Sequence, residues 1–447
     1  MLDPLERWRR YGEKPDFAGL LTYGGQPYTE DPAELAGADP ATDSWLQRLG
    51  RRLFLGKLAG LTHGEVTVIE GADRRRFGKR SADFDLHATI EILHPQTHAD
   101  VAFGGSTGAG EAYMRGHWRS DDLTSLVRIF IRNRPVLNAI ESGSSIATAP
   151  LRRILHALNR NSPEGSRRNI AAHYDLGNDL FALFLGRTMA YSCGIFERED
   201  STLDEAQLAK FERICRKLEL KPDDHLVEIG TGWGGLAIHA AQKYGCRVTT
   251  TTISKEQHHW VAEKIRAAGL SDRITLLMDD YRDLRGQFDK MVSVEMIEAV
   301  GRHYLDVYIA QCSRLLKPNG AMLLQAITIR DQLYESAARG MDFIQRFIFP
   351  GSFLPSVSVI ADSVRRVTDM KVFHLEDIGP HYATTLKTWR ENFFARLPDV
   401  RRLGYPDAFV RMWDFYLSYC EGGCRERQMG DLQLLLTKPQ CRLSVPA

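Results

Sequence analysis

The sequence has 447 residues, more than one hydrophobic core usually supports, so we expect two structural units. A hydrophobic fraction of 43% and a charged fraction of 26% are ordinary for a globular protein and exclude a disordered or collagen-like chain. The formal net charge of +1 excludes any argument from overall electrostatics.

Seven cysteines without a CxxC pair predict a reducing compartment and no disulfide framework. Cys420 and Cys424 lie at helical spacing, but two thiols without a second pair predict no metal site. No stretch approaches the roughly 18 uninterrupted apolar residues of a spanning helix, and the start does not resemble a secretory signal. We therefore expect a cytoplasmic protein that is soluble or reversibly membrane-associated.

The N-terminal third is predicted to contain an arm, a small domain and a linker. Residues 1–44 are rich in Pro, Gly, Asp and Thr and are predicted to form an extended arm. Residues 45–145 are predicted to form a small α+β domain associated with lipid or substrate. Its helix WLQRLGRRLFLGKLAGL precedes two strands, VTVIEG and DLHATIEIL, with the basic turn ADRRRFGKR between them. The linker covers residues 146–165.

From residue 166 to 447, short apolar runs alternate with helical periods, which is typical of a parallel sheet with crossover helices. The predicted strands are HLVEIG, RVTTTTI, RITLLM, FDKMVSVEM and AMLLQAITI. Two further helices are predicted between the strands KVFHLEDIG and DLQLLLTK near the end of the chain.

GTGWGG, residues 230–235, follows the first of these strands and precedes a helix, where backbone N–H groups can meet a ligand. A dinucleotide site would carry an acidic residue about 20 positions further on, but the second strand ends in TTTISKEQ. The third strand ends in MDDYRD, whose acid and aromatic could contact adenine, and Glu228 could bind a ligand amine or the loop backbone. Together these features match the S-adenosylmethionine site of class I methyltransferases.

The stretch HYDLGNDLFALFLGRTMAYSCGIFER, with VEIGTGWGG, TISKEQ and FIFPGSFLPS, closely resembles the cyclopropane fatty acid synthase and mycolic acid cyclopropane synthase family. The resemblance covers roughly residues 165–440. It implies an α/β fold, a class I methyltransferase domain with a Rossmann-like seven-stranded sheet. It also implies methylene transfer from S-adenosylmethionine to the cis double bond of an unsaturated phospholipid acyl chain, through a carbocation that a bound bicarbonate deprotonates.

The resemblance assigns one set of residues to the bicarbonate: Cys193, Glu298, Gln325, Ile327 and Tyr382. Gln325 stands where the family's best-known members have histidine. Its amide can donate a hydrogen bond but cannot become a cation near neutral pH, so we expect weaker or less pH-dependent anion binding. Two further departures are Ala299, where histidine is frequent, and Glu295, where glycine is frequent.

A second set is assigned to S-adenosylmethionine, from its methionine end to its adenine: Tyr174, Tyr191, Ser192, Gly230, Gly232, Thr252, Gln257, Asp280 and Tyr281. Glu228 joins them because of its place before the glycines. His173, Asp175 and Asn178 could instead be turn or capping groups. The aromatic series Phe343, Phe347, Phe349 and Phe353 could line an acyl channel or belong to a core.

Other functions stay open at this point. Loss of a different proton from the same carbocation would give a methylene- or methyl-branched chain. A small-molecule O- or N-methyltransferase would not need the aromatic and basic regions. A non-catalytic lipid-binding relative is disfavoured because Cys193, Glu298 and Tyr382 are retained.

Two basic runs could be solvated faces, or they could contact an anionic membrane surface, which is the partner expected here. Arg74 to Arg80 form the first, and Arg152 to Arg168 form the second. The second run includes LRRILHAL, whose apolar residues share one helical face, a pattern suited to an anionic bilayer. Nucleic acid is not expected, because no recognition motif accompanies either run. The expected partners also include a second copy of the chain, in a homodimer.

Overall fold

The computed structural model describes residues 22–23, 26–27, 45–140 and 176–444. These residues divide into two compact units, each formed by more than one segment of the chain. The segments 342–348 and 393–426 belong to the same unit as the N-terminal residues, although both lie inside the predicted domain 166–447.

The predicted arm and linker lie mostly outside the described residues. Within the arm, β1 (Thr22–Tyr23) and β2 (Gln26–Pro27) form an antiparallel pair. The rest of residues 1–44, and the linker 146–165, stay predictions.

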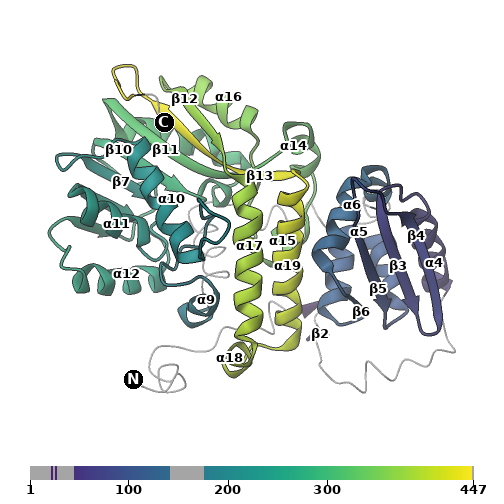
Figure 1. Ribbon diagram of the computed structural model, residues 1–447. Helices are drawn as coiled ribbons and strands as arrows, with labels where there is room; N and C mark the ends of the chain where they lie inside the picture. The colour runs from purple at the N-terminus through teal and green to yellow at the C-terminus, as the bar shows by residue number, and fades with distance from the viewer. Residues whose placement is uncertain (1–21, 24–25, 28–44, 141–175, 445–447) are drawn as a thin grey trace. The chain divides into compact units, whose positions relative to one another are not determined.

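The first unit is built on a four-stranded sheet in the order β4-β3-β5-β6 (Figure 1). The strands are β3 (Gly64–Glu70), β4 (Asp73–Lys79), β5 (His87–Ile92) and β6 (Trp118–Ser120). The prediction of a basic turn at residues 72–80 is wrong, because this segment forms β4 and pairs antiparallel with β3 along its whole length. As an edge strand, β4 leaves its arginines exposed, which suits charged side chains and discourages edge-to-edge association.

The helices of the first unit are α4 (Trp45–Leu58), α5 (Gln96–Met114), α6 (Leu123–Arg132), α15 (Phe343–Phe347), α18 (Leu397–Arg402) and α19 (Asp407–Arg425). Polar contacts between buried side chains join α19 to the N-terminal helices. Tyr113 Oη donates to Asp414 Oδ2 at 2.6 Å, and Thr124 Oγ1 donates to Glu421 Oε2 at 3.1 Å. These bonds explain why the C-terminal helix belongs to the N-terminal unit.

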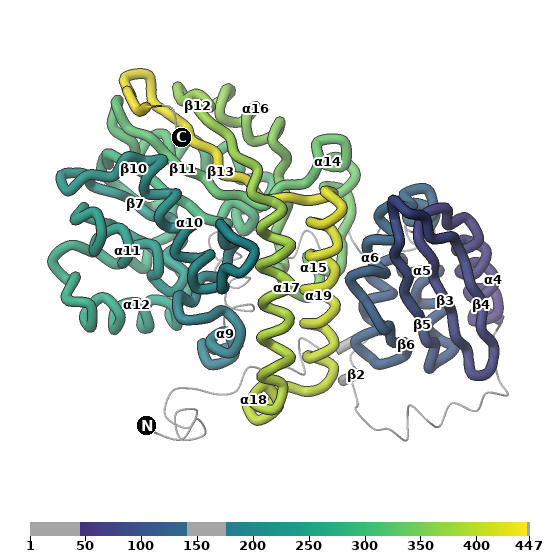
Figure 2. Tube along the Cα trace, in the orientation of Figure 1, coloured from purple at the N-terminus to yellow at the C-terminus, as the bar shows by residue number. Residues whose placement is uncertain are grey.

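The second unit contains a seven-stranded sheet in the order β12-β13-β11-β10-β7-β8-β9. Its strands are β7 (His225–Ile229), β8 (Arg247–Thr251), β9 (Ile274–Leu277), β10 (Phe288–Val294), β11 (Leu316–Ile329), β12 (Lys371–Asp377) and β13 (Met429–Thr437). All neighbours from β9 to β11 run parallel, whereas β13 is antiparallel to both β11 and β12. Figure 2 shows the yellow tube of β13 beside those two strands.

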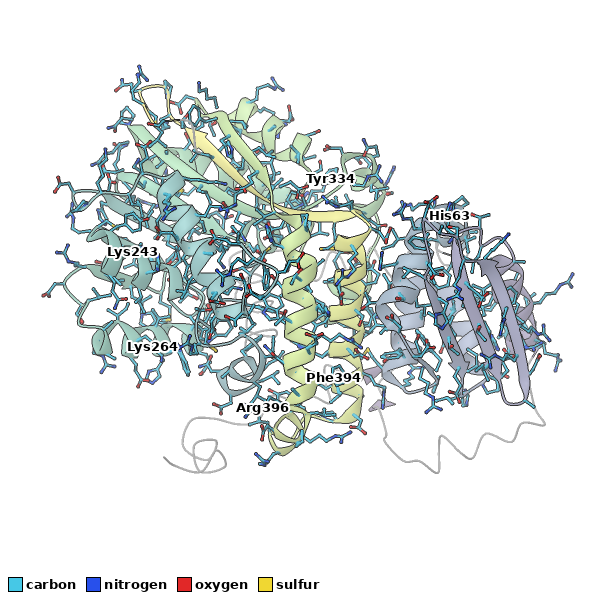
Figure 3. The ribbon with its side chains drawn as sticks, in the orientation of Figure 1. His63, Lys243, Lys264, Tyr334, Phe394 and Arg396 are labelled. Carbon is cyan, nitrogen blue, oxygen red and sulfur yellow. The ribbon has the colours of Figure 1, made fainter. Side chains whose placement is uncertain are left out.

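Helices cover both faces of this sheet, because its strands are apolar on both sides. Leu323 and Leu435 face a core formed with α10 (Leu203–Lys217), α11 (Gly235–Tyr244) and α12 (Lys255–Ala267). The alternate residues Leu324 and Leu434 face a second core formed with α13 (Leu305–Leu315) and α16 (Val357–Val367). Polar residues occupy the outer sides of the helices, as Lys243 and Lys264 show (Figure 3).

Shorter helices and α17 complete the second unit: α9 (Asn178–Phe184), η2 (Ile297–Ala299), η3 (Arg302–Tyr304), α14 (Asp331–Ala337) and α17 (Gly379–Ala395, up to residue 392). In the part of the chain that the structure describes, no helix is long and apolar enough to cross a membrane.

Candidate active site

The predicted site residues that are described belong to the second unit, and many follow the carboxyl ends of its parallel strands. The helix after β7 covers one face of the sheet, whereas the helix after β10 covers the other. Since β7 and β10 are neighbours, the topological switch point lies between them, and ligands of such sheets bind outside the carboxyl ends of the strands at this point.

The glycine loop between β7 and α11 depends on positive φ angles: 98° at Gly230, 53° at Gly232 and 85° at Gly234. The Gly230 N–H donates to the Thr251 carbonyl oxygen at 3.2 Å, which ties the loop to β8. A Cβ at Gly232 would meet no atom within 4 Å, so there is room for a ligand to approach the backbone there. Gly232 is therefore better placed to contact a cofactor, and Gly230 shapes the loop.

Thr252 and Gln257 lie together after β8, and both side chains are buried. Thr252 Oγ1 donates to Gln257 Oε1 at 2.8 Å. Ser254 caps α12 by accepting from the Gln257 N–H at 3.3 Å, which fixes Gln257 in the first turn. A hydroxyl and an amide held side by side suit the hydroxyl groups of a ribose.

Asp280 is held by Arg282, a residue that the sequence analysis did not single out. Arg282 Nε and Nη2 donate to the two carboxylate oxygens of Asp280 at 2.8 and 2.7 Å. Tyr281 Oη is buried and has no hydrogen-bond partner in the described part of the chain. The acid is thus fixed in place, and the adjacent phenol has a polar group available to a ligand.

Glu228 lies buried on β7. Thr250 Oγ1 donates to Glu228 Oε2 at 2.5 Å from the neighbouring strand. Burial raises the pKa of Glu228 to about 8, although the Thr250 hydrogen bond and the positive charge of Lys210 act in the opposite direction.

Ser192 is held by two residues of α10. Its Oγ accepts from Lys210 Nζ at 2.6 Å, and its carbonyl oxygen accepts from Gln207 Nε2 at 2.7 Å. Lys210 is fully buried, and burial lowers the pKa of Lys210 to about 8, while nearby acids, first Glu295, oppose the shift. Lys210 therefore places a cation beneath the segment 191–193.

An aromatic cluster surrounds Tyr191. The ring centre of Tyr191 lies 5.3 Å from that of Phe181, 5.1 Å from Trp389 and 6.3 Å from Phe349. Tyr382 lies about two turns before Trp389 on α17. The two rings meet edge-on, with their centres 6.2 Å apart. The structure thus places Tyr191, Phe349 and Tyr382 in one aromatic cluster.

The other phenylalanines of the predicted channel divide between two cores. Phe343 is buried in the first unit against Phe347 and Phe415, at ring distances of 5.0 and 4.6 Å. Phe353 belongs to a core of the second unit.

Cys193, Glu295 and Gln325 form a compact polar group. The Cys193 N–H donates to Glu295 Oε1 at 2.7 Å, and Gln325 Nε2 donates to the same oxygen at 2.8 Å. Gln325 Nε2 also lies 3.4 Å from the Cys193 carbonyl oxygen and 3.2 Å from Asp431 Oδ2. The Cys193 thiol is buried and points to the carbonyl oxygens of Gly194 and Ile378 instead.

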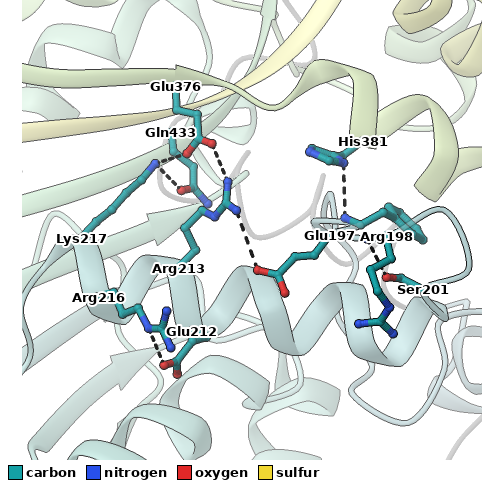
Figure 4. Close-up of polar contacts among 11 residues, drawn as sticks. Glu197, Arg198, Ser201, Glu212, Arg213, Arg216, Lys217, Glu376, His381 and Gln433 are labelled. Carbon is teal, nitrogen blue, oxygen red and sulfur yellow. Dashed lines mark hydrogen bonds and ion pairs between the residues drawn. The ribbon is translucent and has the colours of Figure 1, made fainter. Parts of the chain in front are cut away.

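A second layer fixes the orientation of the Gln325 amide. Gln433 Nε2 donates to Gln325 Oε1 at 3.0 Å, and Lys217 Nζ donates to Gln433 Oε1 at 2.9 Å. Lys217 is in turn paired with Glu376 (Figure 4). This chain of contacts requires the Gln325 amide nitrogen to point towards Glu295 and Asp431.

Glu298 lies buried in η2, after β10. Its Oε1 accepts from the Ile327 N–H at 2.5 Å, whereas its Oε2 has no hydrogen-bond partner among the described residues. Burial, followed by the charge of Glu295, raises the pKa of Glu298 to about 8. A buried carboxyl with one oxygen unsatisfied requires an explanation, and a role in the site is one such explanation.

The donors assigned to a bicarbonate already serve protein carboxylates. The Cys193 N–H and the Gln325 amide donate to Glu295, and the Ile327 N–H donates to Glu298. A second anion at this place would have to compete with the Glu295 carboxylate for two of these donors. The arrangement therefore does not fit an additional bicarbonate.

Some predicted residues have another setting. Tyr174, His173 and Asp175 lie outside the described residues. Asn178 begins α9, and its Oδ1 accepts from Trp233 Nε1 of the glycine loop at 2.7 Å. In the described ranges, no group of three or more His, Cys, Asp or Glu is arranged to hold a metal.

The profile of the mycolic acid cyclopropane synthetase family matches residues 161–434. Cyclopropane-fatty-acyl-phospholipid synthase of Escherichia coli is 38% identical over 351 residues, which are 78% of this chain and 86% of that protein. Tuberculostearic acid methyltransferase UfaA1 of Mycobacterium tuberculosis is 37% identical over 352 residues, which are 75% of this chain and 79% of that protein.

Solved structures give the same picture for the fold. Mycolic acid cyclopropane synthase CmaA1, complexed with SAH and CTAB, aligns with a TM-score of 0.58 at 31% identity and covers 61% of this chain and 98% of its own. Coclaurine N-methyltransferase bound to N-methylheliamine and SAH aligns with a TM-score of 0.55 at 20% identity, over 71% of this chain and 95% of its own. The seven-stranded class I methyltransferase fold predicted from the sequence is confirmed.

Proposed function

Because this chain belongs to the mycolic acid cyclopropane synthetase family of S-adenosylmethionine-dependent methyltransferases, we propose that it acts on unsaturated phospholipid. In this proposal it transfers a methylene group to the cis double bond of an acyl chain, and the product is a cyclopropane fatty acid.

The reaction sets two requirements for the protein. S-adenosylmethionine supplies an electrophilic methyl group when bound. An alkene has no proton to lose before it attacks, so no activated Ser, Cys or Lys nucleophile is needed. The chain must instead exclude water around a cationic lipid intermediate and offer a base close to the new methyl group.

The aromatic cluster around Tyr191 supports the first requirement. The faces of Tyr191, Phe181 and Trp389 can stabilise a cation while keeping water out. The carboxyl groups of Glu295 and Glu298 support the second requirement, since each can accept a proton. Glu295 accepts a hydrogen bond from the Cys193 N–H, and Glu298 accepts one from the Ile327 N–H. The observation that carries the proposal is that the segment 191–193 joins the aromatic cluster to the carboxyl groups. Tyr191 lies in the cluster, and the Cys193 N–H donates to Glu295.

Cofactor binding would rest mainly on residues that follow three strands, β7, β8 and β9. Gly232 leaves room beside the glycine loop, Thr252 and Gln257 suit the ribose, and Asp280 with Tyr281 suit the adenine. Tyr191 and Ser192 would face the methionine end. The Glu228 carboxyl, buried on β7, would bind an amine of the ligand.

The test uses purified protein, labelled S-adenosylmethionine and liposomes of mono-unsaturated phospholipid, followed by mass spectrometry of the acyl chains. We expect a gain of one CH2 that survives mild hydrogenation as a ring. An exocyclic alkene would instead support the branched-chain reaction. Label that enters an added small-molecule O- or N-acceptor and never lipid would overturn the proposal.

Association with an anionic membrane surface is part of the proposal, and the first unit supports it. Arg74, Arg75 and Arg76 are exposed on the edge strand β4. On α4, Trp45 is 65% exposed and Leu49 is 38% exposed, which suits insertion at a bilayer interface. Each cationic contact is worth about 1 kcal/mol, enough for reversible docking.

Vesicle co-sedimentation tests this surface. We expect binding to vesicles that contain phosphatidylserine, little binding to phosphatidylcholine alone, and weaker binding after Arg74, Arg75 and Arg76 are replaced by glutamine. Equal binding to both vesicle types would contradict a charged docking surface. A cytoplasmic location and a homodimer are also proposed, and light scattering after gel filtration tests the second.

A further inference from the structure

Glu295 stands at a backbone position that favours glycine. It directly follows β10, and its φ angle is 48°, in the left-handed region. A side chain is strained in this region. Such strained residues persist where the surrounding structure holds them, and they cluster at active sites. The contacts of the Glu295 side chain show what holds it in this conformation.

Two donors hold the Glu295 carboxylate. Its Oε1 accepts from the Cys193 N–H at 2.7 Å and from Gln325 Nε2 at 2.8 Å. Both donors belong to the set that the family resemblance assigns to an external anion. The Glu295 side chain therefore occupies both of these donors.

The charged groups around Glu295 favour an internal anion over an added one. Asp431 is a hydrogen-bond neighbour of Glu295, and burial together with Glu295 raises the pKa of Asp431 well above its usual value. Glu298 and Glu228 also face this region, with Lys210 as the buried cation opposite them. A further anion beside the Glu295 carboxylate would be disfavoured by charge repulsion.

We infer that the Glu295 carboxylate replaces external bicarbonate in this chain and accepts the proton that the lipid cation releases. The inference rests on the proposed function. In the step, a C–H bond of the transferred methyl group breaks, its electron pair closes the ring C–C bond, and the proton forms an O–H bond on Glu295. Gln325 and the Cys193 N–H orient the carboxylate.

The experiment compares variants at a position that accepts glycine without strain. Turnover is measured in CO2-free buffer and with added bicarbonate, and bicarbonate binding is followed by 13C NMR. Wild-type turnover should be equal in both buffers, with no binding signal. Glu295→Gly should lose at least about 100-fold in CO2-free buffer, recover in part with bicarbonate, and bind it.

Two further variants sharpen the result. Glu295→Gln should lose turnover without rescue, because the amide still fills the space. Glu295→Gly combined with Gln325→His should bind bicarbonate more tightly than Glu295→Gly alone. Glu335→Gln, an exposed change on α14, is the matched control and should leave turnover unchanged. Binding of S-adenosylhomocysteine and thermal unfolding report whether each variant is folded.

Several outcomes would overturn the inference: bicarbonate binding by the wild type, acceleration of wild-type turnover by bicarbonate, or a Glu295→Gly variant with full turnover in CO2-free buffer. Failure of the proposed function is distinguishable, because it would appear as a wild type that never labels lipid. The binding measurements decide the inference even then, since they need no turnover.

Discussion

The cofactor end and the proton-transfer end of the second unit are built in different ways. At the cofactor end, predicted contact residues already have partners, as in the Thr252–Gln257 pair and the Asp280–Arg282 pair. At the proton-transfer end, Glu298 keeps one buried carboxyl oxygen without a hydrogen bond among the described residues. At the cofactor end, the Thr252–Gln257 and Asp280–Arg282 pairs are thus completed by the protein itself, and Tyr281 Oη is the group without a partner there.

This difference has an energetic consequence. A buried polar group without a partner costs about 1 to 3 kcal/mol, and a buried carboxyl also resists ionisation. Glu298 at the proton-transfer end, and Glu228 and Tyr281 at the cofactor end, therefore reduce the stability of the fold, whereas the paired residues of the cofactor end do not. Changes at the two ends should affect different measurements.

The largest effect is expected from Glu298→Gln. The amide keeps the size of the side chain and an acceptor for the Ile327 N–H, but it cannot exchange a proton. Turnover should fall at least about 100-fold, while the affinity for S-adenosylhomocysteine stays close to that of the wild type in calorimetry. Glu335→Gln serves as the matched control. A loss of cofactor affinity would place Glu298 at the cofactor end instead.

Asp280→Asn should have the opposite signature. The change removes the negative charge of the carboxylate that Arg282 holds with two hydrogen bonds, and it replaces one of the two acceptor oxygens by an N–H donor. S-adenosylmethionine affinity should fall about tenfold, the equivalent of 1.4 kcal/mol, and kcat at saturating cofactor should change little. An unchanged cofactor affinity with a lower kcat would mean that Asp280 acts in turnover and not in cofactor binding, and this would contradict the comparison of the two ends.

The sequence predicts much of this architecture, because buried parallel strands are written as apolar runs between helical periods. The glycine loop at 230–235 and the helices of the tail were predicted in place. The basic segment 72–80 was mistaken for a turn, since an exposed edge strand has no apolar pattern.

The network behind the site was not predicted. Asp431 and Gln433 meet Gln325 only because β13 pairs antiparallel with β11 across more than 100 residues of chain. Lys210 follows the pattern of an amphipathic helix, and nothing in α10 marks it as the residue that binds Ser192. Such contacts depend on strand register and helix rotation, which local patterns do not specify. Arg282 could have been predicted from the sequence, because it directly follows Asp280 and Tyr281, the predicted acid and aromatic.

A pH titration of stability sharpens the comparison further. The folded protein holds the protons of Glu228 and Glu298 up to a pKa of about 8, compared with an ordinary value of 4.5. The folded state thus binds more protons between these values, so the free energy of unfolding should fall as pH rises from 5 to 8. Each group contributes at most about 1.4 kcal/mol per pH unit.

Denaturant unfolding at several pH values measures this slope. Glu298→Gln should make it shallower, because the amide no longer titrates, whereas Asp280→Asn should leave it unchanged. A slope that Glu298→Gln leaves unchanged would mean that Glu298 is ionised in the folded protein over this interval, whereas histidines with lowered pKa values, such as His117, affect both proteins equally.

Cys193→Ser is expected to have the smallest effect. Cys193 reaches the carboxyl group through its backbone N–H, which the substitution keeps, and the thiol instead points to the Gly194 carbonyl oxygen at 3.2 Å. A serine hydroxyl can make the same contact. Turnover should therefore fall by less than about tenfold, the equivalent of 1.4 kcal/mol, with cofactor affinity unchanged. A loss as large as that of Glu298→Gln would assign the thiol itself to proton transfer, and Cys193 would then be more than a positioning residue.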